Sequence, residues 1–138
     1  MIYTAVKVTI KNYEATMNNN IILYRGDKNV EIQFEILESL YRQYRNTGTN
    51  VILNLDASFG QLVVRKPDDS YVFSEVTATK EGKVVFTIPG DMIDETAELG
   101  SYTFQIRLYD ETQESRVTLP PVVGGIEIVE PIASEDTE

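Results

Sequence analysis

The side chains that most often perform enzymatic chemistry are missing from this sequence of 138 residues. It contains no cysteine and no histidine. A cysteine nucleophile, a thiolate zinc site and the commonest general base near neutral pH are therefore excluded. A glycine-rich phosphate loop and the Gly-x-Ser-x-Gly motif of serine hydrolases are also absent. We expect a protein that is not an enzyme and that requires no cofactor.

Carboxylates are the remaining groups that could do chemistry. A glycosidase needs two of them held across the scissile bond, but the sequence brings no particular pair together. Asp91, Asp94 and Glu95 form a loose cluster without the Asp-x-Asp-x-Asp-Gly spacing of a calcium loop. A two-carboxylate hydrolase stays open as an alternative, and so does a bound calcium ion. Most of the candidate carboxylates lie at expected turns, where acidic residues are usually solvated. The candidates are Asp56, Asp68, Asp69, Asp91, Asp94, Glu95, Glu98, Asp110, Glu111 and Glu114.

The tripeptide Arg25-Gly26-Asp27 matches the integrin-recognition motif. Such a role needs an exposed loop tip and an animal cell-surface partner. Glycine followed by Asp27 and Lys28 is also ordinary turn chemistry, and a match of three residues is weak evidence. We therefore interpret the tripeptide as a turn.

Two tyrosines and two arginines gather at Tyr41, Arg42, Tyr44 and Arg45. Tyrosine and arginine dominate binding hot spots, because they bury a large area and keep a polar end. In an acidic protein this cluster reverses the local charge, which makes it the candidate protein interface. The alternative stays open that the tyrosines pack beneath a loop while the arginines neutralise nearby acids.

The charge balance limits the class of partner. With 12 basic and 22 acidic residues the net charge is −10, so nucleic acid and acidic membrane surfaces are repelled. No apolar run is long enough to span a bilayer, and the first residues do not form a secretory signal. The hydrophobic fraction of 42% and the charged fraction of 25% are those of a globular protein with a core.

Period-two alternation of apolar and polar residues recurs along the chain and predicts strands with one buried face. The clearest runs are 30–36 and 102–108, and turn residues such as those at 66–70 separate the runs. After that turn, one side of the expected strand carries Tyr71, Phe73 and Glu75, and the other side carries Val72 and Val76. This mixture indicates that burial there is less one-sided.

These runs predict an all-β domain over residues 1–130, with about eight or nine short antiparallel strands in a sandwich or barrel. Residues 37–50 break the alternation and predict a loop with one helical turn. Residues 92–99 predict a second short connection, and Gly124-Gly125 precedes a last strand at 126–129. Residues 131–138 are acidic, and we expect a disordered tail or the start of a linker.

Four segments carry a resemblance that covers nearly the whole chain in order. They are 23–30 (LYRGDKNV) with 32–34 (IQF), 62–70 (LVVRKPDDS), 100–110 (GSYTFQIRLYD), and 115–121 (SRVTLPP) running into 125–128 (GIEI). Together they resemble the N-terminal domain of the phage baseplate upper protein family. The shared motifs are structural, and the family has no catalytic residues to transfer.

The resemblance implies an immunoglobulin-like sandwich in the tail tip of a siphophage with a Gram-positive host. Such domains attach to the distal tail hub, while more C-terminal parts of the full protein carry the receptor-binding protein. The expected location is the virion tail, after synthesis in the bacterial cytoplasm, and a homo-oligomer is expected from the symmetry of tail organelles. Larger members continue beyond the position of Glu138, so this chain is either an excised domain or a minimal member.

Protein docking is not the only function that this sequence allows. A carbohydrate-binding or adhesion module at the host cell surface is the alternative, with tyrosines stacking against sugars. The sequence has 8 tyrosines but no tryptophan, and the missing tryptophan counts against this alternative. Saturable binding of host cell-wall polysaccharide distinguishes the two functions.

Overall fold

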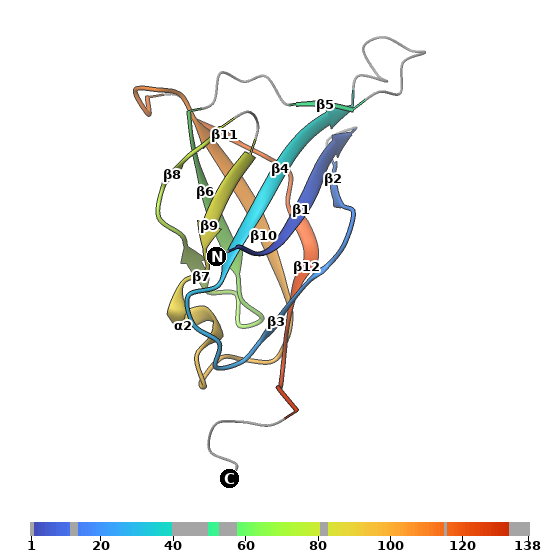
Figure 1. Cartoon of the computed structure of the whole chain (residues 1–138), viewed down its shortest axis with the longest axis vertical. Helices are drawn as coiled ribbons and strands as arrows, with labels where there is room; N and C mark the ends of the chain where they lie inside the picture. The colour runs from blue at the N-terminus through green and yellow to red at the C-terminus, as the bar shows by residue number, and fades with distance from the viewer. Residues whose placement is uncertain are drawn as a thin grey trace.

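Two β-sheets pack face to face and form a sandwich (Figure 1). The computed structural model describes residues 2–11, 14–39, 50–52, 58–80, 83–114 and 116–132. Within these ranges the strands form one five-stranded sheet and one seven-stranded sheet. The all-β prediction is therefore confirmed.

The five-stranded sheet has the order β2-β1-β4-β5, and β9 also pairs with β4. β1 runs parallel to β4, whereas the other pairs are antiparallel. The strands are β1 (Ile2–Lys11), β2 (Glu14–Met17), β4 (Glu31–Ser39), β5 (Asn50–Ile52) and β9 (Lys83–Thr87).

The seven-stranded sheet has the order β3-β12-β10-β6-β7, with β11 paired to β10 and β8 paired to β6. β3 runs parallel to β12, and the other pairs are antiparallel. The strands are β3 (Ile21–Tyr24), β6 (Phe59–Arg65), β7 (Tyr71–Phe73), β8 (Thr77–Ala78), β10 (Gly100–Tyr109), β11 (Arg116–Thr118) and β12 (Val122–Val129).

The inward-facing side chains of both sheets form one hydrophobic core. The two clearest alternating runs behave as predicted, with every second residue buried over 30–36 and over 102–108. Phe34 of β4 lies at the centre, where its ring centroid is 5.6 Å from that of Phe86 and 5.4 Å from that of Phe104. Because Phe104 belongs to the other sheet, this tilted aromatic cluster joins the two layers.

The expectation of purely antiparallel pairing is wrong in two places. β1 pairs with β4 and β3 pairs with β12 in parallel. Parallel pairing needs a long connection between the paired strands, and alternation within a strand carries no information about a distant partner. The described residues also contain more strands than the predicted eight or nine, and four of them are only two to four residues long.

Two boundaries differ from the sequence prediction. β4 continues to Ser39, so residues 37–39 belong to a strand and not to the expected loop; the rest of the expected helical turn lies outside the described residues. β12 begins at Val122 and runs through both glycines. Gly125 is needed inside the strand, because an added Cβ would lie only 2.7 Å from Phe104 Cε1.

A buried tyrosine closes the corner between α2 (Gly90–Ile93) and β10. Tyr102 is 1% exposed, and its hydroxyl donates a hydrogen bond to the Glu98 carbonyl oxygen at 2.5 Å. Burial raises the pKa of the Tyr102 hydroxyl, with smaller contributions from the Glu98 and Asp68 carboxylates. The hydroxyl therefore stays protonated and donates to the carbonyl oxygen of Glu98, a residue that lies outside the strands and the helix.

Candidate functional site

The candidate interface residues Tyr41, Arg42, Tyr44 and Arg45 lie outside the described residues. Their role as an interface or as a packing lid stays a prediction. Within the described residues, no helix is long and apolar enough to cross a membrane.

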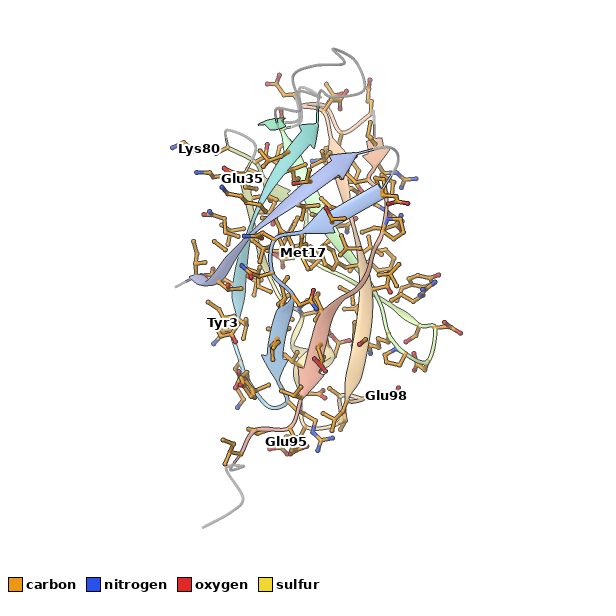
Figure 2. All side chains as sticks on the ribbon, turned by 90° about the vertical axis from the view of Figure 1, so that its right-hand side faces the viewer. Tyr3, Met17, Glu35, Lys80, Glu95 and Glu98 are labelled. Atoms are coloured by element: carbon orange, nitrogen blue, oxygen red, sulfur yellow. The ribbon has the colours of Figure 1, made fainter. Side chains whose placement is uncertain are left out.

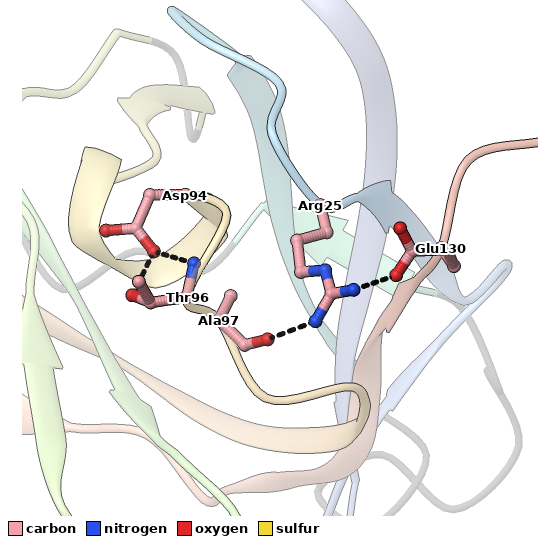
Figure 3. A network of polar contacts seen from close by, with 5 residues as sticks. All are labelled: Arg25, Asp94, Thr96, Ala97 and Glu130. Carbon is pink, nitrogen blue, oxygen red and sulfur yellow. Dashed lines mark hydrogen bonds and ion pairs between the residues drawn. The ribbon is translucent and has the colours of Figure 1, made fainter. Parts of the chain in front are cut away.

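The side chain of Arg25 is held by the protein itself. Its guanidinium forms an ion pair with the Glu130 carboxylate and donates a hydrogen bond to the Ala97 carbonyl oxygen at 3.4 Å (Figure 3). The neighbouring Gly26 N–H donates to the Ile93 carbonyl oxygen at 2.6 Å. The expected turn is present at Arg25-Gly26, and it ties β3 to the α2 connection and to the end of β12.

Two turn carboxylates accept hydrogen bonds from their own turns. Asp94 Oδ1 accepts from the backbone N–H and the hydroxyl of Thr96 at 2.9 and 2.6 Å (Figure 3). Asp68 has the same arrangement with Ser70. These hydrogen bonds lower the pKa of both carboxyl groups. Nowhere in the described ranges are three metal-ligating side chains grouped to hold an ion.

A groove of about 890 Å³ opens at the end of the sandwich that carries α2. Figure 2 shows two acidic side chains, Glu95 and Glu98, at the same end of the sandwich as the end of β12. Only Glu95 of these two lines the groove. The charged side chains of the lining are mostly acidic, which would favour a basic group. The charged residues of the lining are Asp27, Lys28, Glu75, Asp94 and Glu95.

The five-stranded sheet exposes Ile2 and Tyr3 at the start of β1 and carries a group of paired charges on its outer face. Glu35 of β4 lies in register between Lys7 of β1 and Lys83 of β9. Each lysine Nζ is 3.9 Å from a Glu35 carboxylate oxygen, and Glu35 lies on the outside of the ribbon in Figure 2. Exposed ion pairs of this kind contribute little to stability.

The outer face of the seven-stranded sheet is different, because aromatic and cationic side chains meet there. Arg65 of β6 is in register with Tyr71 of β7, and Val63 is in register with Phe73. Tyr71 is 60% exposed and Phe73 is 50% exposed. The Arg107 guanidinium of β10 lies over the Phe73 ring, 5.4 Å from its centroid, which is a cation–π distance.

A shallow depression of about 140 Å³ adjoins these residues. Val63 contributes to its lining; this side chain is 6% exposed but is not part of the core between the sheets. Val123 of β12, which is 79% exposed, lies on the rim with Pro121. We call the set Val63, Arg65, Tyr71, Phe73, Arg107 and Val123 the arginine–aromatic face.

The sequence predicted only part of this face. Alternation placed Tyr71 and Phe73 on one side of a strand and Val72 on the other, as observed. It could not say that Val72 is on the buried side, because valine and phenylalanine are both often fully buried. The arginines were not detectable as a group, since β6 and β10 are distant in sequence and meet only through strand pairing.

Comparison with solved structures places the fold in a known group. The chain matches the N-terminal domain of phage TP901-1 ORF48, a baseplate upper protein, with a TM-score of 0.58 and 10% sequence identity. The match covers 93% of this chain and 99% of that chain. No family model and no curated protein sequence matches. The expected resemblance to the phage baseplate upper protein is therefore confirmed at the level of the fold.

Proposed function

We propose that this chain is a protein-docking domain of a phage tail baseplate, and that it acts in the virion without catalysis. The observation that carries the proposal is the fold, which matches a baseplate domain over 93% of the chain. The proposed partners are the distal tail hub and the receptor-binding protein, and the domain links the two. Assembly as a homo-oligomer is part of the proposal, since repeated tail subunits form closed symmetric interfaces.

The surface chemistry supports docking. The charged side chains Lys7, Glu35 and Lys83 of one sheet pair with one another, whereas the other sheet exposes two aromatic rings close to two arginines without a carboxylate partner among the described residues. Aromatic residues and arginine are enriched in protein interfaces and at binding hot spots. A domain that serves only as a spacer has no need to expose them.

The immunoglobulin-like topology is a further part of the proposal. The segment from Glu98 to Phe104 reads Glu-x-Gly-x-Tyr-x-Phe, and the Tyr102 hydroxyl bonds to backbone four residues upstream. Sandwiches of the immunoglobulin class use a comparable tyrosine at the same kind of corner. We also propose residues 1–130 as one domain, with 131–138 as the start of a linker or a tail.

The proposal is tested by purifying the chain together with the distal tail protein encoded in the same phage genome. Size-exclusion chromatography with light scattering should give a stable complex of defined stoichiometry. In the double variant Tyr44→Ala/Arg45→Ala, we expect weaker binding with nearly unchanged thermal stability if these residues form an interface. A large fall in melting temperature with unchanged binding would instead support the packing interpretation.

Carbohydrate binding remains the alternative function, because an exposed ring such as Tyr71 can stack on a sugar. Titration of the isolated chain with host cell-wall polysaccharide distinguishes the two functions. Saturable polysaccharide binding, together with no binding to tail proteins, would overturn the docking proposal. Binding to the tail protein alone would remove the alternative.

A further inference from the structure

We propose that the arginine–aromatic face is the docking surface, and that its occupant is a segment of another tail protein that carries carboxylates beside apolar side chains. This inference rests on the proposed docking function and deepens it by naming the surface and the chemistry of the partner. Three properties of the face carry it: its apolar area, its order before binding, and its charge.

The apolar side chains of the face come from β6, β7 and β12, and polar side chains of β10 lie between β6 and β12. Pairing of β10 with β6 and of β6 with β7 places Val63 beside Phe73 and Arg65 beside Tyr71. The depression joins this area to Val123 on β12. Exposed apolar groups that lie together favour burial by a partner far more than scattered ones do. The depression offers a place for one small apolar side chain of the occupant.

The face is largely ordered before a partner arrives. Arg107 is held against Phe73 by the cation–π contact. The central polar groups are already bonded within the sheet: Gln61 Nε2 donates to the Ser74 carbonyl oxygen, and Gln105 Nε2 donates to the Leu119 carbonyl oxygen, both at 3.1 Å. A partner that covers them therefore leaves few donors without acceptors, and few side chains lose freedom on binding.

The charge of the face specifies the partner. Arg65 and Arg107 have no carboxylate partner among the described residues. The outward-facing positions of β6, β7 and β10 carry no acidic residue, although the chain has a net charge of −10. An arginine fork binds a carboxylate in two places at once. A second copy of this chain is a poorer occupant, because two bodies of charge −10 repel each other.

The test uses the purified distal tail protein as the probe and isothermal titration calorimetry as the readout. The double variants Arg65→Glu/Arg107→Glu and Tyr71→Ser/Phe73→Ser should each weaken binding roughly tenfold or more, as expected of central interface residues. Raising the salt concentration should weaken binding of the unaltered chain, because the contact depends on opposite charges. The arginine variant should lose most of that salt dependence.

Matched controls separate this surface from other exposed groups. Lys7→Glu/Lys80→Glu changes the net charge by the same amount at exposed lysines away from the face. Ile22→Ser/Tyr24→Ser removes two apolar side chains that are 44% and 40% exposed on β3, at the other edge of the same sheet. Both controls should bind within about twofold of the unaltered chain. Circular dichroism and melting temperature confirm that every variant is folded.

The possible outcomes are distinguishable. If the unaltered chain binds the tail protein and the face variants bind equally well, the inference is overturned while the proposed function stands. If the unaltered chain binds no tail protein, the proposed function fails and the inference fails with it. If the face variants abolish self-association seen by analytical ultracentrifugation, and hub binding is unaffected, the occupant is a second copy and the acidic partner is refuted.

Discussion

Replacing Tyr102 with phenylalanine removes one hydroxyl group and leaves the rest of the buried ring in place. That hydroxyl donates to the Glu98 carbonyl oxygen at 2.5 Å, at the corner that leads from α2 into β10. The ring itself is 1% exposed and belongs to the core between the sheets. The variant therefore isolates the contribution of the hydrogen bond from that of apolar burial.

The expected cost follows from what happens to the carbonyl. A neutral hydrogen bond contributes about 0.5–1.5 kcal/mol net, and an acceptor left buried without a partner adds to the loss. Glu98 is an exposed residue, so water can reach part of the orphaned carbonyl. We expect a loss of about 1–1.5 kcal/mol in the free energy of unfolding. For a domain of this size that corresponds to a fall of roughly 3–6 °C in melting temperature.

The pH dependence gives a second, independent signature. The folded pKa of Tyr102 is raised, first by burial and then by the Glu98 and Asp68 carboxylates. Below the unfolded pKa of about 10, the hydroxyl is protonated in both states, so its full contribution is present. Above pH 10 the unfolded chain loses this proton first, and the contribution falls as pH rises through the folded pKa. The stability gap between the unaltered chain and Tyr102→Phe should therefore narrow above pH 10.

Urea unfolding followed by circular dichroism measures both effects between pH 7 and pH 11. The control is Tyr71→Phe, because the Tyr71 side chain is 60% exposed and its hydroxyl has no partner among the described residues. That variant should change the free energy of unfolding by less than about 0.5 kcal/mol. Equal stability of Tyr102→Phe and the unaltered chain at pH 7, or a constant gap up to pH 11, would refute the reasoning.

Three further predictions concern the core and the α2 end. Phe34→Ala should lower the free energy of unfolding by about 3–5 kcal/mol in denaturant titration, because this fully buried ring joins both sheets and leaves a cavity; a loss below about 1 kcal/mol would contradict its central place. Gly125→Ala should lower the free energy of unfolding by about 1–3 kcal/mol, because the added methyl group overpacks against Phe104. Gly90→Ala is the control, because open space surrounds its Cβ, and it should lower the free energy of unfolding by less than about 0.5 kcal/mol. Arg25→Ala should lower the free energy of unfolding by about 1 kcal/mol, as measured by thermal unfolding, because it removes the contacts to Glu130 and Ala97. An unchanged melting temperature would mean that water replaces both contacts.

Some features of the arginine–aromatic face could be predicted from the sequence and others could not. The alternation at 71–73 separates two aromatic residues from Val72, because side chains on a strand point to opposite faces in turn. Which face is buried depends on what covers it, and Val72 belongs to the hydrophobic core. The turn at Arg25-Gly26 could also be predicted from residue types. The ion pair of Arg25 with Glu130 could not, because it joins residues far apart in the chain.

The sequence by itself determined the class of structure and the chemistry that is excluded. Period-two alternation is a local property, so the strands at 30–36 and 102–108 could be predicted without knowing which strands they pair with. The absence of histidine and cysteine excludes imidazole and thiol chemistry whatever the fold. Only the tertiary structure decided how the strands pair. The parallel pairs β1–β4 and β3–β12, and the meeting of Arg107 with Phe73, are contacts between distant segments. Such contacts depend on the packing of the whole chain, which no local pattern encodes.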